Sequence, residues 1–544
     1  FINNSRGMHM KYLSVFYSKH ILKTPFFLLA YGIIALIFMA FNLALDYGDI
    51  EHTNYIVRFD SLAYIEIVLV AIVFCIAAYF AQEKNGLEQM CLYSKAQIEI
   101  NKIVMTIVCS LSFCFIPALF IILSAAIERT ELKFTVLSLV YAIIRWAIII
   151  IITETTAYAL ASIMKSRSVY FFCIPCTVIF SYLNIYIFLR LFGKNAEKIS
   201  NFFSLQKTFI NGLDMDYPGP RIDLFLISKV LCACVFLFLI MSIMWFFLSN
   251  KHRRIAGLAL IGCFVGEVIS VAYWNALYPE YYSYDQKLYI ADYEKQNWQV
   301  LSYEGNINLS ENTSIQCEIV IHPTAGNLDT ITFRLDEQFK NVNISIGNTS
   351  CSYTRNGDYI TIRIPSSDME SVIALRCSYS GRISYVSDIS SVNIYTSWFS
   401  AALPVNFAFL PILDGDYSKK DYSLTVIGLN DIISNLNTTS AAPHSYNLKG
   451  KAQACCIFMG FFDREIKDGI ELYHARYNNL SDYWNELEIA RERKCLNPNT
   501  YKVYDRTDEL PEKVFVIYYL YGVLGVPVVF DDCVFLNYGY PSSR

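Results

Sequence analysis

Long runs of apolar side chains dominate the first 277 residues, and seven of these runs are long enough to span a membrane. A helix needs about 20 residues to cross a hydrocarbon layer of about 30 Å. The runs cover approximately 25–45, 61–82, 103–127, 134–161, 169–192, 225–248 and 255–277. This pattern predicts a polytopic α-helical membrane protein, with a six-span core over residues 25–248 and a seventh span over residues 255–277.

The residues before the first run have the spacing of a helix that lies along a membrane surface. Apolar side chains recur there among the basic residues Lys11, Lys19 and Lys23, as they do in interfacial helices. Residues 1–24 are therefore predicted to form an amphipathic elbow on the cytoplasmic side. A simple basic anchor fits the same pattern and stays open as an alternative.

The periodicity changes after residue 284. Residues 314–321, 330–335 and 359–364 alternate apolar and polar positions, which is typical of half-buried antiparallel strands. Residues 285–473 are predicted to form an all-β sandwich of ordinary size. Residues 474–544 combine a predicted helix, 482–493, with two short apolar runs, and this mixture predicts a small α/β region.

Composition and charge agree with two different halves. The 544 residues are 54% hydrophobic and 17% charged, whereas an average soluble chain is about 25% charged. Lys and Arg outnumber Asp and Glu by 22 to 16 in residues 1–275, while residues 276–544 hold 22 basic and 32 acidic side chains. No basic run or stripe marks a nucleic-acid surface, so we expect no nucleic-acid partner.

Basic side chains in the short loops predict the orientation in a cell membrane. Lys165 and Arg167 lie in one loop, Lys251 to Arg254 lie in another, and both fall on the side of the basic N-terminal tail. Cytoplasmic loops are enriched in Lys and Arg, and the intervening loop 46–60 is acidic. The N-terminus is therefore predicted to be cytoplasmic and the C-terminal half extracytoplasmic.

The apolar runs include charged side chains, among them Glu66, Arg145, Glu154 and Glu267. Counting about 1.5 Å per residue places Arg145 and Glu267 near the middle of the membrane. An ion pair between these two is one hypothesis, and a separate polar cavity for each is the other. Glu66 and Glu154 lie near the ends of their runs, where a side chain is expected to extend to the interface.

The predicted cytoplasmic segment between the second and third runs carries charges of both signs. Glu83, Gly86, Leu87 and Glu88 begin it, Ser94 follows, and Lys102 opens the third run. This order resembles the coupling loop of the type-2 ABC export permeases, which contains a Glu, a Gly, a Leu-rich helix, a Ser or Arg turn and a Lys. The proline that often precedes the turn in that family is Tyr93 here.

The resemblance implies a permease subunit of an ATP-driven exporter. Its partners would be a second permease subunit, identical or different, and ABC ATPase subunits docked on this loop. Such permeases also fold short helices back toward the membrane in the segment that corresponds to residues 193–224. ATP and Mg²⁺ would bind the ATPase, because Gly193-Lys194 and Gly450-Lys451 lack the following Ser or Thr of a P-loop. We expect no cofactor on this chain.

The strand-rich half resembles a different family. Strand patterns over about 190 residues, with the landmarks Tyr379-Ser380-Gly381 and Trp398-Phe399, resemble the N-terminal sandwich of zinc aminopeptidases of the aminopeptidase N type. Residues 474–544 resemble the entry to a peptidase domain that stops at Arg544. None of the seven His residues begins the zinc motif His-Glu-x-x-His, so we expect neither a metal site nor an enzyme on this chain.

Two alternatives to export remain open at this point. One is a membrane-anchored protein whose outer sandwich binds a peptide or acts as a sensor, since sheet edges are able to bind an extended ligand. The other is a truncated membrane-bound zinc aminopeptidase.

Overall fold

The computed structural model divides the chain into two compact units. Residues 1–208 and 224–278 belong to a helical unit, and residues 209–223 and 279–544 belong to a β-rich unit. The predicted change from apolar helices to strands is therefore confirmed. The residues described are 14–47, 63–83, 95–164, 167–181, 183–192, 196–203, 222–248, 253–278, 280–282, 298–324, 329–347, 349–364, 372–387, 393–405, 407–413, 416, 418–476, 495–497, 502–504, 511, 513–516, 528–529 and 532–536.

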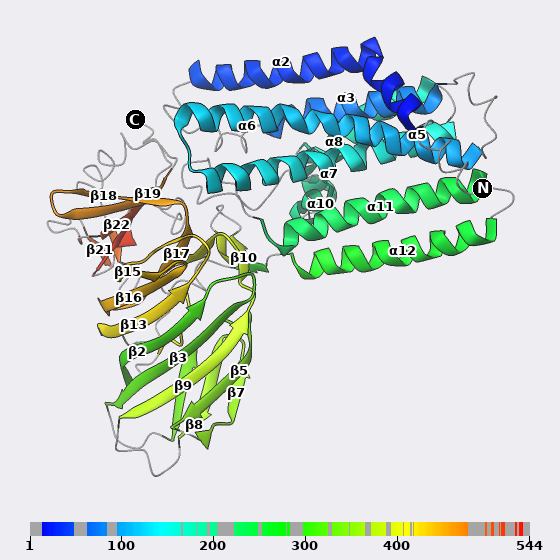
Figure 1. The fold of residues 1–544 in the computed structure, drawn as a ribbon. Coiled ribbons are helices and arrows are strands. Elements are labelled where there is room, and N and C mark those ends of the chain that lie inside the picture. Colours follow the sequence, from blue (N-terminus) through cyan, green and yellow to red (C-terminus); the bar gives the residue numbers. More distant parts are fainter. Residues whose placement is uncertain are drawn as a thin grey trace, which may run out of the picture. The chain divides into compact units, whose positions relative to one another are not determined.

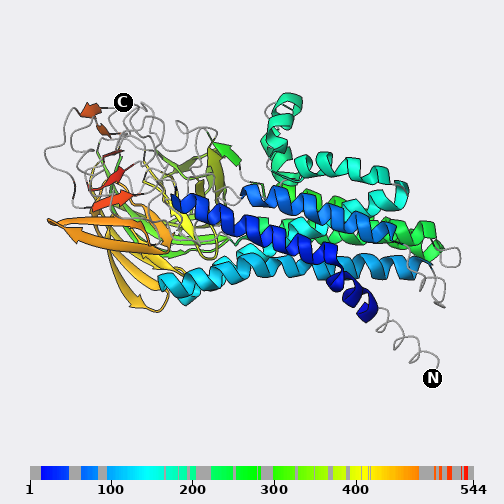
Figure 2. The ribbon, with the colours of Figure 1, turned by 90° about the horizontal axis from the view of Figure 1, so that it is seen from above.

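Long helices run alongside one another in the helical unit (Figures 1 and 2). The helices are α2 (Pro25–Tyr47), α3 (Ala63–Gln82), α5 (Lys95–Ser110), α6 (Phe115–Glu128), α7 (Leu132–Met164), α8 (Cys173–Ile179), α9 (Asn184–Phe192), α10 (Ala196–Phe203), α11 (Leu224–Leu248) and α12 (Arg253–Ala276). The 3₁₀ turn η2 (Leu111–Cys114) joins α5 to α6, and η3 (Arg167–Phe172) precedes α8.

Several of these helices are able to span a membrane. Among the described residues, five helical stretches are long and apolar enough, with Gln97–Ile127 counted as one, and a sixth results if helix Ser14–Lys23 and α2 form one bent span. The bend between them is 59°. The Thr24 Oγ1 donates a 2.7 Å hydrogen bond to the His20 carbonyl oxygen. Pro25 follows, and because it has no N–H it starts a new helix more readily than it continues one.

The predicted fifth span is not one continuous helix. Over residues 169–192 the chain forms part of η3, then α8, which ends at Ile179, and α9, which begins at Asn184. The Asn184 Nδ2 donates a 2.7 Å hydrogen bond to the Ile179 carbonyl oxygen, and the Asn184 backbone N–H donates to Ser181. These polar groups satisfy the helix ends locally, which an apolar count over the whole run does not reveal.

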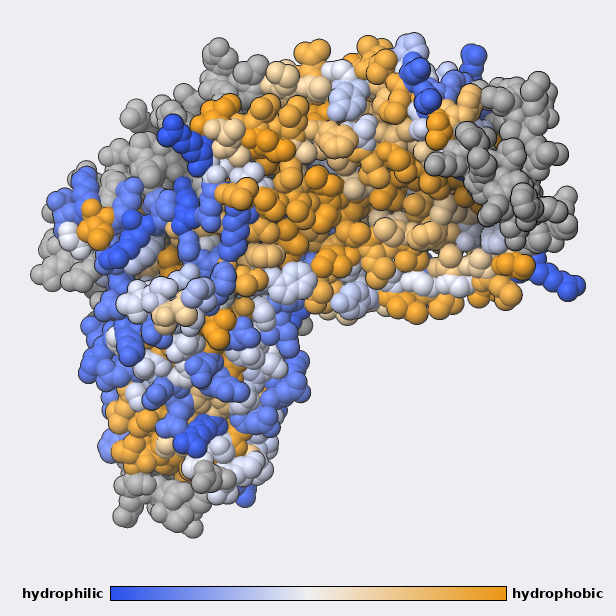
Figure 3. All heavy atoms as spheres, in the orientation of Figure 1, coloured by the Kyte–Doolittle hydropathy of each residue, from blue (hydrophilic) through white to orange (hydrophobic). Residues whose placement is uncertain are grey.

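Apolar side chains cover most of the face of the helical unit that Figure 3 shows. In the most apolar 18-residue stretches of α12 and α11, only 11% and 22% of the residues are buried within the chain. Leu258, Ile261 and Phe264 of α12 are each at least 60% exposed. A contiguous apolar surface of this kind marks contact with lipid or with another protein.

Four sheets make up the described part of the β-rich unit. The largest contains, in spatial order, β15 (Asn437–Ala442), β16 (Ser445–Ala452), β13 (Lys420–Ile427), β2 (Trp298–Asn308), β3 (Thr313–Pro323), β9 (Ile373–Gly381), β5 (Phe339–Ile346) and β6 (Thr349–Ser350). A three-stranded sheet contains β4 (Thr330–Arg334), β8 (Tyr359–Arg363) and β7 (Tyr353–Asn356). The three alternating segments noted in the sequence fall in β3, β4 and β8.

The other two sheets contain six and seven strands. A six-stranded sheet contains β1 (Glu280–Tyr282), β10 (Ser384–Ser387), β11 (Asn393–Thr396), β12 (Ala401–Leu403), β17 (Ile457–Gly460) and β14 (Asp431–Ile433). A seven-stranded sheet contains β18 (Phe462–Lys467), β19 (Ile470–Ala475), β22 (Lys513–Val516), β24 (Val534–Leu536), β23 (Val528–Val529), β20 (Cys495–Asn497) and β21 (Lys502–Tyr504).

One apolar core joins the four sheets. Inward-facing residues alternate along β3, where Ile315, Ile319 and Ile321 are at most 1% exposed. The same core contains Phe458 of β17 and Phe515 of β22. Burial of apolar side chains on one face of each strand is the main force that holds sheets together.

The seven-stranded sheet begins earlier than the predicted boundary at residue 474. Strand β18 pairs with β19 as a hairpin, from Phe462 opposite Ala475 onward, and β19 pairs in parallel with β22. Residues 462–473 therefore belong with the C-terminal strands. Their alternation resembles that of the preceding strands, so the sequence pattern alone assigns them to the sandwich. The predicted helix 482–493 lies outside the described residues.

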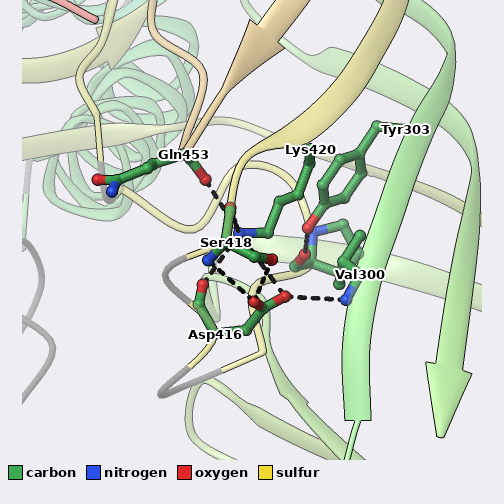
Figure 4. Close-up of polar contacts among 7 residues, drawn as sticks. Val300, Tyr303, Asp416, Ser418, Lys420 and Gln453 are labelled. Atoms are coloured by element: carbon green, nitrogen blue, oxygen red, sulfur yellow. Dashed lines mark hydrogen bonds and ion pairs between the residues drawn. The ribbon is translucent and has the colours of Figure 1, made fainter. Parts of the chain in front are cut away.

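Lys420, a buried residue at the start of β13, is the centre of a polar cluster that also involves residues of β2 and the residue after β16 (Figure 4). The Lys420 Nζ donates hydrogen bonds to the carbonyl oxygens of Asp416, Ser418 and Gln453, at 2.9, 2.7 and 3.1 Å. The Asp416 carboxylate lies 3.6 Å from this ammonium and accepts a 2.8 Å hydrogen bond from the Val300 backbone N–H. Burial lowers the pKa of Lys420, and the Asp416 charge opposes that effect. This cluster has its hydrogen-bonding groups satisfied, so its role is structural.

Candidate functional site

The two ends of the predicted coupling loop meet in the structure. Glu83 directly follows α3, and Lys102 lies in α5. The Lys102 Nζ donates a 2.9 Å hydrogen bond to the Glu83 carbonyl oxygen. Lys102 is 4% exposed, so water has little access to this bond. The other four predicted loop positions, Gly86, Leu87, Glu88 and Ser94, lie outside the described residues.

Helix Ser14–Lys23 lies against the Glu83–Lys102 contact, which we call the loop base. The His20 Nε2 lies 3.0 Å from both carboxylate oxygens of Glu83. The Asn101 Nδ2 donates a 2.9 Å hydrogen bond to the Ser14 Oγ. The N-terminal helix is thus attached both to the end of α3 and to α5.

The sequence pattern does not identify His20 or Asn101 as part of the loop base. His20 follows the apolar spacing of its helix, and its ring stacks on Phe16 with 6.0 Å between the ring centroids. Its charged partner, Glu83, is far away in the chain, so no local pattern connects the two. Asn101 directly precedes Lys102, and that adjacency is the one signal available in the sequence.

The loop base is suited to holding a segment in place. The His20 and Glu83 side chains are 33% and 22% exposed, and an ion pair with this access to water is worth at most about 1 kcal/mol. The shielded hydrogen bond of Lys102 is the stronger restraint. Within the described ranges, no group of three or more His, Cys, Asp or Glu side chains is placed to hold a metal ion. These contacts hold the end of α3, α5 and the N-terminal helix together.

The intramembrane charges pair differently from the prediction. The Arg145 Nε lies 2.6 Å from the Glu66 Oε1, and the two side chains are 3% and 2% exposed. Glu267 instead accepts a 3.4 Å hydrogen bond from the Ser270 Oγ on its own helix. The predicted ion pair between Arg145 and Glu267 is therefore wrong, as is the expected extension of Glu66 to the interface.

The helix α7 is longer than a membrane span requires. At about 1.5 Å per residue, its 33 residues make a helix of about 50 Å, longer than the hydrocarbon layer of about 30 Å. A count along the apolar run therefore does not by itself give the depth of Arg145. In the structure Arg145 lies level with Glu66, which is in the first turn of α3.

Glu154 does not extend to the interface either. It is 0% exposed, and the Ser110 Oγ at the end of α5 donates a hydrogen bond to its Oε1. The helix α7 continues to Met164, so Glu154 lies well inside it. The expected extension of Glu154 is wrong because neighbouring helices enclose the side chain.

One short helix, α10, lies between the fifth and sixth apolar runs, in the part of 193–224 that the structure describes. The helix α10 packs on α9, and the Ser200 Oγ donates a hydrogen bond to the Asn184 Oδ1. Phe202 of α10 contacts Trp274 of α12, with 5.1 Å between the ring centroids. The chain therefore makes a helical hairpin there, and residues 204–221 lie outside the described residues.

Comparisons with known proteins find structural neighbours only. Sequence profiles of protein families give no match, and curated protein sequences give none. Among solved structures, an M1 zinc metallopeptidase from Deinococcus radiodurans matches with a TM-score of 0.33 and 10% identity, over 46% of this chain and 63% of that chain. Native yeast LTA4 hydrolase matches with a TM-score of 0.30 and 10% identity, over 44% of this chain and 40% of that chain.

These neighbours are of the M1 zinc peptidase and LTA4 hydrolase kind, and neither of the two is a permease. This chain spans less than two thirds of each of them. Because the TM-scores are below 0.5 and the identities are about 10%, the likeness assigns no activity to this chain.

Proposed function

We propose that this chain is the membrane-spanning permease subunit of an ATP-driven exporter and carries an extracytoplasmic peptidase-like domain for binding a substrate or partner. The observation that carries the proposal is the loop base. Lys102 and Glu83 close the predicted coupling loop, and His20 attaches the N-terminal helix to the same point. The loop is therefore tied to α3, to α5 and to the N-terminal helix together.

Mechanical coupling between a bound partner and the membrane helices requires a loop whose base is firmly attached to those helices. If a partner pushes on the loop, a restraint at its base transmits the motion to both helices, whereas a slack loop absorbs it. The chain has no P-loop of its own, since neither Gly-Lys pair precedes a Ser or Thr. ATP and Mg²⁺ would therefore bind a separate ATPase subunit, and the chain itself would not be an enzyme.

The distribution of charge supports the proposed orientation in a cell membrane. Lys19 and Lys23 lie on the N-terminal helix, and Arg253 and Arg254 are the first two residues of α12 on the same predicted side. Basic residues of this kind favour the cytoplasmic face. An ATPase would dock there, and the β-rich unit would lie outside the cell. As in related exporters, two permease subunits, identical or different, would share two ATPases.

Purification of the full chain from its native membranes tests the proposal. We expect ATP hydrolysis in the purified material, and we expect Glu83→Ala and Gly86→Val to reduce that activity severalfold. Glu267→Gln is the matched control, because the Glu267 side chain accepts its hydrogen bond from Ser270 of its own helix and lies outside the loop base. Unchanged gel-filtration profiles are required of all variants, so that loss of activity is not loss of folding.

Two outcomes would contradict the proposal. Wild-type material without ATP hydrolysis, prepared under conditions that preserve known membrane complexes, would favour the membrane-anchored binding or sensory protein. Aminopeptidase activity in the product of the complete gene, together with a His-Glu-x-x-His motif in its sequence, would favour the truncated zinc aminopeptidase.

A further inference from the structure

Among the carboxyl groups described in the helical unit, that of Glu154 is the most completely enclosed. It lies on α7 and is 0% exposed. The Ser110 Oγ donates a hydrogen bond to its Oε1. Its second oxygen, Oε2, is buried and has no hydrogen-bond partner among the described residues. One hydroxyl group therefore provides all of the polar contact that the structure gives this carboxyl group.

An ionised carboxylate in this position would be strongly destabilised. Moving a charge out of water without a paired charge costs many kcal/mol, and such groups normally become neutral instead. A counter-ion is the usual remedy, as Arg145 is for Glu66 at 2.6 Å. Glu154 has no such ion pair with any described residue.

The charged and titratable groups on the helices that pack against α7 have other contacts. On α3, Glu66 pairs with Arg145. On α5, Glu99 accepts a 3.1 Å hydrogen bond from the Tyr158 hydroxyl, and Lys102 donates to Glu83. On α11, the Lys229 Nζ lies 4.9 Å from the centre of the Phe225 ring. Among side chains that the structure describes, the remaining titratable ones on these elements are Tyr79, Cys75, Cys109, Cys114, Cys232, Cys234, Arg167 and Tyr170.

A polar seam leads from the loop base to Glu154. Glu99, Lys102, Thr106 and Ser110 follow one another along α5 at three- and four-residue steps, which places them on one helix face. The ends of this seam contact α7: Glu99 meets Tyr158, and Ser110 meets Glu154. Apolar contacts alone are enough to pack two helices together, so these polar side chains of α5 are not needed for packing. The seam therefore connects the buried carboxyl group, which contacts Ser110 at the end of α5, with Glu99 and Lys102 nearer the start of the helix.

We propose that Glu154 is a proton-binding site and that it carries a proton in this conformation. The neutral carboxyl group accepts the Ser110 hydrogen bond and retains its own O–H, so no unpaired charge is buried. Loss of the proton would leave a carboxylate that needs water or a cation. Release therefore requires α5 and α7 to separate at Ser110, and proton occupancy is linked to how these two helices pack. This inference does not depend on the proposed export function.

Infrared spectroscopy of the full chain in lipid nanodiscs tests the proposal without any transport assay. A protonated, buried carboxyl group gives a carbonyl stretching band that is separate from the carboxylate bands and shifts in D₂O. We expect this band in the wild-type protein at neutral pH. The substitution Glu154→Gln, which keeps the shape and the Ser110 contact, should remove it, and Glu267→Gln should leave it in place.

A second variant keeps the test decisive if Glu154→Gln fails to fold. Ser110→Ala retains the carboxyl group and removes its donor, so the band should remain and move to higher frequency. Loss of a carboxylate band in Glu154→Gln, with no change in the protonated region, would overturn the proposal. An unchanged band in Ser110→Ala would do the same, because it would assign the signal to another residue.

Discussion

Arg145 and Glu66 form a buried ion pair between α7 and α3, with 2.6 Å between the Arg145 Nε and the Glu66 Oε1. Neither side chain is more than 3% exposed, so water does not screen the pair. Removal of one partner from such a pair leaves the other charge buried without compensation. Replacement of both partners by neutral side chains leaves no buried charge, so it costs less stability than the two single replacements together.

We therefore expect Glu66→Gln and Arg145→Gln each to lower the free energy of unfolding by about 3–5 kcal/mol. The double variant should lose less than the sum of the single variants, because the two side chains act together. Unfolding of the full chain in detergent, followed by tryptophan fluorescence, measures all three. Glu267→Gln should change the value by no more than about 0.5 kcal/mol. Additive losses in the cycle would contradict the pairing.

The loop base gives a second prediction. Lys102→Met removes the hydrogen bond to the Glu83 carbonyl oxygen, and a bond from a charged donor is worth about 1.5–3 kcal/mol. Backbone amides in residues 84–101 should then exchange with deuterium at least about tenfold faster. Hydrogen-exchange mass spectrometry resolves this segment. Lys19→Met, at an exposed position of the N-terminal helix, is the control, and equal exchange in both variants would exclude a restraint by Lys102.

The buried lysine of the β-rich unit gives a third prediction. Lys420→Met leaves three carbonyl oxygens without their donor and leaves Asp416 without its counter-ion. We expect a loss of about 3–5 kcal/mol in the stability of the β-rich unit. Lys451 is a matched control, because its ammonium lies 3.3 Å from Asp421 with side chains 69% and 61% exposed. Lys451→Met should cost less than about 1 kcal/mol in the same thermal unfolding experiment.

Much of the helical unit could be predicted from the sequence because length and apolar composition are local properties. The runs at 225–248 and 255–277 correspond closely to α11 and α12. Contacts between helices are not local, and the partner of Arg145 is therefore hidden in the sequence. Glu66 and Glu267 are equally plausible counter-ions until the neighbours of α7 are known. The loop base has the same property, since Glu83 and His20 come together only when the helices pack.

Strands could be predicted, but their neighbours could not. Alternation along residues 314–321 reveals that β3 is half-buried, whereas the parallel pairing of β13 with β2 joins distant segments. The landmark Tyr379-Ser380-Gly381 also has a physical explanation that the sequence does not contain. A Cβ atom on Gly381 would lie 2.2 Å from the Gln338 carbonyl oxygen. Only glycine allows this close approach of two strands.

The β18–β19 hairpin contains an acidic group that makes stability depend on pH. The Tyr473 hydroxyl donates a 2.7 Å hydrogen bond to the Glu471 Oε2, and the Arg464 guanidinium contacts Glu471 Oε1. Burial alone would raise the pKa of Glu471, but the hydrogen bonds from Tyr473 and Arg464 and the Arg464 charge outweigh it and hold this pKa below its ordinary value.

Because the pKa of Glu471 is lower in the folded state than in the unfolded state, the unfolded chain binds the proton more readily as the pH falls. The stabilisation is therefore complete above the ordinary value of about 4.3 and is lost as the pH falls through the folded-state value. We expect the melting temperature of the β-rich unit to decrease over this range and to decrease less steeply in Glu471→Gln. Glu337→Gln, at an exposed position, should keep the wild-type dependence. Parallel curves for wild type and Glu471→Gln would show that these contacts do not favour the ionised form.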